Sequence, residues 1–328
     1  CSPEDLGALV AHAHALVPRR RVYVAINTLV LDHELDAAAE TLAQVALAQA
    51  DAVIVQDLGV ARLAQRFFPT LALHASTQMA VHSLEGARIL HRLGFKRVTL
   101  ARELTLAEIR RIAEMSGIEV EVFAHGALCY SYSGLCLYSS HMRGRSGNRG
   151  RCAYPCRDRF TVADEAWHPV GQSRFSFSMK DMAMTDHIGD LRRAGVAAFK
   201  IEGRKKSPLY VAAATTLYRG LIDNTLDELQ RGELEADLRS VFSRPWTSLF
   251  MTSRKARAVT DPDMVGHRGA RIGAAGEVAS TSGGDRLRFM TERRIERHDG
   301  MQIDLPDAGR PYGFAVDELW LVDPGRAA

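Results

Sequence analysis

Short β-branched runs alternate with amphipathic helical stretches along the chain up to residue 201, and this alternation is its most constraining feature. Stretches such as "SLEGARILHRLG" and "TLAEIRRIAEMSG" begin on Ser or Thr and end at Gly, as capped helices do. Such alternation predicts parallel βα units. The strand-like runs are Val22–Ile26, Ala52–Val55, Leu71–Ala75, Arg97–Leu100, Val120–Ala124, Phe175–Ser178 and Ala198–Ile201.

Seven such runs are close to the eight strands of a (β/α)8 barrel, and a doubly wound sheet would also fit. Polar and charged residues directly follow most of the runs, and they favour the barrel, because barrel enzymes gather the carboxyl ends of their strands at one mouth. These residues are Asn27, Gln56, Asp57, Ser76, Thr77, Gln78, Arg102, Glu103, His125, Lys180, Asp181, Glu202 and Arg204.

Composition places the chain among ordinary globular proteins. It has 328 residues, of which 46% are hydrophobic and 25% charged, and its formal net charge is +3. No apolar run reaches the roughly 18 residues of a membrane span. The opening residues "CSPEDLGALV" lack the basic and apolar regions of a signal peptide. We therefore expect a cytoplasmic protein with no membrane association.

Four of the five cysteines lie in one Gly- and Arg-rich segment, "HGALCYSYSGLCLYSSHMRGRSGNRGRCAYPC". They are Cys129, Cys136, Cys152 and Cys156, with the spacing C-x6-C-x15-C-x3-C. Disulfides are disfavoured, since nothing indicates secretion. Four thiolates suit either tetrahedral zinc or an iron–sulfur cluster. From the residues alone, the cluster, zinc and unligated cysteines all remain open.

The cysteine segment resembles the signature of the collagenase-like peptidase family U32, in "EVFAHGALCYSYSGLCLYSS" and "NRGRCAYPC". Supporting stretches are "VYVAINTLV", "ADAVIVQDLGV", "LHASTQMAV", "RVTLARELTL", "SMKDM" and "GVAAFKIEGRKKSPLYVA". The resemblance runs from about Ser2 to Asp223 and implies a (β/α)8 TIM-like barrel. The family's first strand and its "PAG"-like turn are absent at the start, so we expect a barrel lacking its first strand or strands.

The resemblance also implies a chemistry. It implies that the four cysteines bind a 4Fe–4S cluster, as in family members that hydroxylate RNA bases or a quinone precursor without O2, with prephenate as oxygen donor. We therefore expect hydroxylation of a base in tRNA or rRNA, with RNA as partner and, as in some members, a homologous partner subunit. The alternatives are a quinone-biosynthesis hydroxylase subunit and a collagenase-like peptidase. No G-x-S-x-G or H-E-x-x-H stretch supports proteolysis.

Two sets of residues are assigned roles by this hypothesis. The expected catalytic set is His125, Lys180, Asp181, Glu202 and Arg204. The expected substrate-binding set is Asn27, Gln56, Gln78, Arg102, Glu103, Arg145 and Arg149. Arginines suit either a carboxylate donor or RNA phosphates, and the loop tyrosines offer faces for base stacking, although they could equally pack the loop onto the barrel.

The last part of the chain has a different pattern. From about residue 256, short strand-like stretches such as "DRLRFMT" and "GFAVDEL" alternate with turns, which predicts a small β-domain. We therefore expect residues 1–235 to form the barrel, with the cysteine-rich loop at 125–160, and residues 236–328 to form a linker and an accessory β-domain. This accessory domain is either a structural lid or a grip for an extended substrate.

Overall fold

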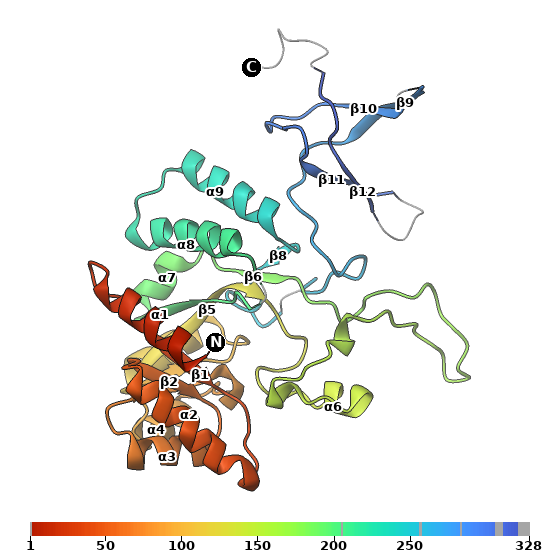
Figure 1. The fold of residues 1–328 in the computed structure, drawn as a ribbon. Helices are drawn as coiled ribbons and strands as arrows, with labels where there is room; N and C mark the ends of the chain where they lie inside the picture. The colour runs from red at the N-terminus through yellow and green to blue at the C-terminus, as the bar shows by residue number, and fades with distance from the viewer. Residues whose placement is uncertain (1, 205, 256–257, 283, 306–310, 321–328) are drawn as a thin grey trace. The chain divides into compact units, whose positions relative to one another are not determined.

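The computed structural model describes residues 2–204, 206–255, 258–282, 284–305 and 311–320. The chain divides into two compact units between His267 and Arg268 (Figure 1). Within the described ranges, no helix combines the length and the apolar composition needed to cross a membrane.

The first unit is an α/β structure built on an eight-stranded sheet. Its strands are β1 (Tyr23–Ile26), β2 (Ala52–Val55), β3 (Ala72–Ala75), β4 (Arg97–Thr99), β5 (Glu119–Ala127), β6 (Asp181–Ala183), β7 (Ala198–Ile201) and β8 (Trp246–Thr247). Its α-helices are α1 (Pro3–Ala15), α2 (Leu35–Leu47), α3 (Leu58–Phe67), α4 (Leu84–Arg92), α5 (Leu106–Met115), α6 (Tyr138–Arg143), α7 (Ile188–Arg193), α8 (Pro208–Asp223) and α9 (Glu228–Val241).

Six strands run parallel in the order β1-β2-β3-β4-β5-β7. The last three residues of β5 pair antiparallel with β6, which pairs in parallel with β8. The predicted α/β class with a mostly parallel sheet is confirmed. A closed (β/α)8 barrel is not, because among the described residues β1 pairs only with β2 and β7 only with β5.

Helix α4 shows why the sequence forms these units. Ser83 caps it by accepting a hydrogen bond from the backbone N–H of Gly86. Leu84, Ala87 and Leu90 lie on one face and are buried in the core, as the helical period requires. Strands β2 to β5 are largely buried as well, which is typical of parallel sheets covered by helices.

The predicted run Phe175–Ser178 is wrong as a strand. The backbone N–H of Ser178 bonds the carbonyl of Phe175 in a turn, and the strand begins only at Asp181. The reason is a tertiary contact, since the Arg157 guanidinium donates to Ser178 Oγ at 2.8 Å and to the carbonyl of Met179. The alternation in "FSFSM" therefore does not mark a strand, because Arg157 holds this segment in a turn.

The division between the units also falls later than the predicted boundary at residues 235/236. That boundary lies inside α9, which packs against α8, and β8 beyond it pairs with β6. The second unit contains two antiparallel hairpins, and this agrees with a small β-domain. They are β9 (Ala275–Thr281) with β10 (Gly284–Phe289), and β11 (Gly300–Ile303) with β12 (Tyr312–Ala315).

Candidate functional site

The cysteine loop leaves the carboxyl end of β5 and folds back over the ends of neighbouring strands. Gly134 takes a left-handed φ of +78°, and a Cβ there would lie 2.4 Å from the carbonyl oxygen of Gln78. Only glycine allows so close an approach of two backbones. The loop therefore sits directly on the turn that follows β3.

Ser133 fixes the same part of the loop to the end of β4. Its backbone N–H donates to Glu103 Oε1 at 3.0 Å, and its hydroxyl accepts from the backbone N–H of Arg102 at 3.0 Å. Ser133 is 1% exposed. Glu103, predicted to bind substrate, thus holds the loop with one oxygen, while its Oε2 is buried with no hydrogen-bond partner among the described residues.

The second half of the loop is tied to the segment after β1. Arg149 donates to both carboxylate oxygens of Glu34, at 2.9 and 2.6 Å, and to the carbonyl of Leu29. The hydrogen bonds from Arg149 lower the pKa of Glu34 to about 2. Arg149 was predicted to bind substrate; in the structure its guanidinium is instead engaged in holding the loop.

The four loop cysteines are free thiols, and Cys1 lies outside the described residues. Although Cys129 as a whole is exposed, burial of its thiol raises its pKa, and the thiols of Cys136 and Cys152 raise it further. Burial likewise raises the pKa of Cys156, followed by the charges of Cys129, Cys152 and Cys136. The four sulfurs are therefore near enough to influence one another's ionisation.

Cys136 behaves differently. Burial acts to raise the pKa of its thiol, but hydrogen bonds from Ser131 and from the backbone at Ser139 and Tyr138 outweigh it, so the pKa is lowered. A thiol that is stabilised as thiolate is the better metal ligand.

The four thiols are donor groups of the kind that an iron–sulfur cluster requires. A single zinc ion draws four sulfurs to about 3.8 Å from one another, from its Zn–S distance and tetrahedral geometry. No three or more Cys, His, Asp or Glu side chains of the described residues are gathered closely enough to hold one metal ion. A cluster places its own iron atoms between the thiolates and accepts a wider set.

Arg157 lies beside these thiols, and sequence analysis missed it. Its guanidinium donates to Leu128 O, Met179 O and Ser178 Oγ. Burial lowers its pKa, and Arg244 lowers it further, while Cys156, Asp181 and Cys129 act in the opposite direction. The only sequence signal was an arginine directly after Cys156.

His125 is buried at the end of β5, with 2% of its surface exposed. Its Nδ1 lies 3.2 Å from the hydroxyl of Tyr218, which itself donates to the carbonyl of Ala124 at 2.8 Å. Because the Tyr218 hydroxyl uses its own proton in this bond, it can only accept a hydrogen bond from His125. Nδ1 of His125 therefore carries the ring proton, and Nε2 is the basic nitrogen. Burial lowers the pKa of His125 to about 4, so the ring is neutral at pH 7.

The other predicted catalytic residues do not form one cluster of bonded side chains. Asp181 is 3% exposed and accepts from the guanidinium of Arg244 at 3.0 Å, a pair that structures the strand end. Glu202 Oε1 accepts from the backbone N–H of Arg204, whose side chain is exposed. The backbone N–H of Lys180 donates to Val259 O, and its side chain is half-buried.

Lys206 is a second residue that sequence analysis missed. Its ammonium lies over the ring of Phe242 and 5.3 Å from the centroid of Tyr210. Burial lowers the pKa of Lys206 to about 8, against the effect of Asp181. It lies in "IEGRKK", where the neighbouring Glu and Arg drew attention instead.

Some residues of the predicted substrate-binding set form hydrogen bonds with residues at the ends of neighbouring strands. Asn27 Nδ2 donates to Ser76 Oγ at 3.4 Å, and Gln56 Nε2 donates to the carbonyl of Gln78 at 3.4 Å. The guanidinium of Arg102 lies 3.8 Å from the ring centroid of Phe123.

Arg102 also lies near the cysteines. Burial lowers the pKa of Arg102, whereas Glu202, Cys129 and Glu103 act to raise it. A Cβ on Gly126 would lie 2.5 Å from Cβ of Glu202. The ends of β4, β5 and β7 therefore converge beside the cysteine loop.

The outer face of the loop is exposed and mixes cations with aromatic rings. Arg145 is exposed, with no side-chain hydrogen bond or ion pair to the described residues. The ring of Tyr130, half exposed, packs 4.8 Å from that of Phe177. Of the loop's predicted substrate-binding arginines, Arg145 alone thus presents its charge to solvent.

Comparison with known proteins gives the family. The chain is 34% identical to a 23S rRNA 5-hydroxycytidine C2501 synthase of Escherichia coli, over 92% of this chain and 46% of that protein. It is 32% identical to a tRNA hydroxylation protein P of Helicobacter pylori (75% and 60%) and 31% identical to a collagenase of Porphyromonas gingivalis (71% and 60%). The chain thus spans about half to two thirds of the length of these relatives.

The solved structure of the U32 peptidase Mk0906 aligns with 38% of this chain at 18% identity and a TM-score of 0.33, a similarity too low to define the fold. The model of peptidase family U32 matches residues 1–261. Because this match covers most of the 328 residues, the chain belongs to peptidase family U32.

Proposed function

We propose that this chain carries the catalytic centre of an iron–sulfur-dependent enzyme that hydroxylates a base in tRNA or rRNA without O2, with prephenate as oxygen donor. The observation that carries the proposal is the loop with four mutually interacting thiols, clamped over the carboxyl ends of β3, β4 and β5. Relatives named as rRNA and tRNA hydroxylases support the substrate class.

The four thiols would hold the cluster, which when bound would supply electron transfer. Arg157 sits beside Cys156 and Cys129. Its positive charge would stabilise their thiolates and shift the redox potential of the centre upward.

An anionic oxygen donor needs cations at the same place. Arg102 lies beside Cys129, with its guanidinium close to Glu202. The ammonium of Lys206 lies on two aromatic rings and forms no ion pair with any residue that the structure describes. Both could receive a carboxylate. In the reaction, the base would be oxidised by two electrons and the donor reduced by the same two, so no external oxidant is required.

Proton handling would fall to two groups in this region. His125 is neutral at pH 7 with Nε2 as its basic atom. Lys206, with a pKa of about 8, can hold or release a proton at Nζ near neutral pH. On the outer face, Arg145 would contact RNA phosphates and Tyr130 would stack on a base.

The test is an anaerobic assay of cluster-reconstituted protein with tRNA and rRNA, in which mass spectrometry looks for one added oxygen. The matched pair is Cys152→Ser, in the loop, and Cys1→Ser, the one cysteine outside it. We expect oxidised RNA from the wild type and from Cys1→Ser when prephenate is supplied, and none from Cys152→Ser.

The collagenase name of one relative makes proteolysis the competing function. His125 has no hydrogen bond to any of the four described cysteines, so no Cys–His dyad is formed there. A gelatin assay runs beside the RNA assay. Cleavage that survives Cys152→Ser, together with unmodified RNA from every variant, contradicts the hydroxylase proposal.

A further inference from the structure

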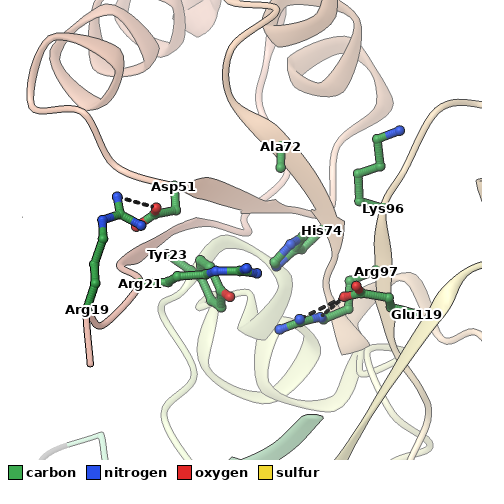
Figure 2. Close-up of a pocket in the computed structure, with 9 residues that line it drawn as sticks. All are labelled: Arg19, Arg21, Tyr23, Asp51, Ala72, His74, Lys96, Arg97 and Glu119. Atoms are coloured by element: carbon green, nitrogen blue, oxygen red, sulfur yellow. Dashed lines mark hydrogen bonds and ion pairs between the residues drawn. The ribbon is translucent and has the colours of Figure 1, made fainter. Parts of the chain in front are cut away.

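A pocket of about 440 Å³ lies at the amino ends of the parallel strands, the end opposite the cysteine loop (Figure 2). Its walls come from the first residues of strands and the segments just before them, including Tyr23 of β1, Lys96 before β4 and Arg97 of β4. Such a volume holds a small ligand.

The pocket is positively charged. Its lining contains four cations, Arg19, Arg21, Lys96 and Arg97, against two carboxylates, Asp51 and Glu119. Figure 2 shows both carboxylates already engaged, Asp51 by Arg19 and Glu119 by Arg97.

Two of these cations are uncompensated. The side chains of Arg21 and Lys96 are exposed and make no hydrogen bond or ion pair to any residue that the structure describes. Figure 2 shows the Arg21 guanidinium directed toward His74, whereas the Lys96 ammonium is directed away from it, so Arg21 is the cation that brings an unneutralised charge to the centre of the pocket.

A buried polar atom in the pocket wall also supports a bound ligand. His74 is 5% exposed, and its Nδ1 is buried with no hydrogen-bond partner in the described chain. Burial lowers the pKa of His74 to about 4, and Arg97 lowers it further, so the ring is neutral at pH 7. A buried polar atom that lacks a partner requires an explanation, and a bound ligand supplies one.

We propose that this pocket binds a phosphate group, carried either by a nucleic-acid strand or by a free phosphate monoester. Arg21, which has no counterion among the described residues, can pair with a phosphate that is a diester of charge about −1 in a strand or a monoester of charge about −2. Arg21 presents a planar fork that suits phosphate oxygens, and Lys96 adds a point charge. Nothing in this site depends on the cysteine loop, so the proposal stands apart from the hydroxylase function.

The experiment titrates the full chain with inorganic phosphate, followed by calorimetry and by 31P line width at low ionic strength. The test variant is Arg21→Gln/Lys96→Gln. The control is Arg110→Gln/Arg111→Gln, which removes the same charge from two exposed residues of α5 that do not line the pocket. Equal urea midpoints for both variants establish that folding is unchanged.

Saturable phosphate binding is expected, weakened about tenfold or more in Arg21→Gln/Lys96→Gln, because the charge-assisted contact with Arg21 and the nearby charge of Lys96 are lost. The control should stay within about twofold, since exposed charges that do not line the pocket are screened. Equal losses in both variants, or no saturable binding by the wild type, overturn the proposal.

A second arm, with a short single-stranded RNA, identifies the source of the phosphate. If the strand provides it, inorganic phosphate competes with RNA and the pocket variant weakens RNA binding. If a free monoester provides it, RNA binding is indifferent to both substitutions while phosphate binding still depends on them.

Discussion

The two ends of the parallel strands use their cations differently. At the carboxyl end, three arginines in or near the cysteine loop are engaged by oxygen atoms of the protein, Arg149 by Glu34, Arg157 by three oxygens and Arg244 by Asp181. At the amino end, Arg21 and Lys96 have no side-chain partner among the described residues. The carboxyl end thus uses most of these arginines to hold a loop in place, whereas the amino end leaves two cations without a protein partner among the described residues.

The largest effect is expected from a substitution that disturbs only the carboxyl end of the parallel strands. In Gly134→Ala the new Cβ would lie 2.4 Å from the carbonyl oxygen of Gln78, and residue 134 would keep a φ of +78°. The loop must therefore move away from the turn after β3, which should lower the free energy of unfolding by about 3 kcal/mol or more. Gly144→Ala is the matched control. It also has a positive φ, +62°, but nothing lies within 4 Å, so it should cost about 1 kcal/mol.

Urea unfolding and iron content measure this difference. Iron binding should be lost in Gly134→Ala and kept in Gly144→Ala, while phosphate binding at the amino end persists in both. Equal behaviour of the two variants would show that the loop is not seated on the turn after β3.

The next effect concerns the buried histidine of the carboxyl end. The pKa of His125 is about 4 in the folded chain, against about 6.5 unfolded. As the pH falls from 6.5 to 4, protons bind the unfolded state preferentially, so stability declines over that window. The share of His125 in this decline is up to about 3 kcal/mol, from about 1.36 kcal/mol per pKa unit.

His125→Asn keeps a donor toward the Tyr218 hydroxyl and removes the titration. The free energy of unfolding, measured between pH 6.5 and 4, should fall less steeply in this variant. His12→Asn, an exposed position in α1, should retain the wild-type slope. An unchanged slope in His125→Asn would mean that the ring is not held neutral.

The smallest effect is expected for the half-buried ion pair between Glu34 and Arg149. The pKa of Glu34 is lowered from 4.5 to about 2, so the contribution of this pair is complete above pH 4.5 and is lost as the pH falls toward 2. A double-mutant cycle with Glu34→Gln and Arg149→Gln should show favourable coupling at pH 7 that shrinks by pH 3. Coupling that is absent at pH 7 would remove Arg149 from the loop's attachments.

The sequence predicted the regular part of the molecule well, for a physical reason. Caps such as Ser83 and the buried face of α4 are local patterns, and so are the β-branched strands. The failures involve contacts between distant segments. "FSFSM" has strand-like alternation, yet Arg157 holds it in a turn, and whether the sheet closes depends on pairing between its two edges.

The residues of the candidate site likewise include some that the sequence could predict and some that it could not. The position of the four cysteines after β5 could be inferred from spacing and family resemblance. Arg157 and Lys206 could not, because their importance comes from burial beside Cys156 and Asp181, which no local pattern reports. The ion pair of Arg149 could not be predicted either, since its partner Glu34 lies 115 residues away along the chain.

The iron and sulfide content of anaerobically purified protein tests the central claim most directly. The wild type should hold about four iron and about four sulfide ions per chain, and each of Cys129→Ser, Cys136→Ser, Cys152→Ser and Cys156→Ser should lose most of them. Arg21→Gln/Lys96→Gln, at the other end of the strands, should keep the full content. Stoichiometric zinc without sulfide in the wild type, or full iron content in any of the four cysteine variants, would contradict the account.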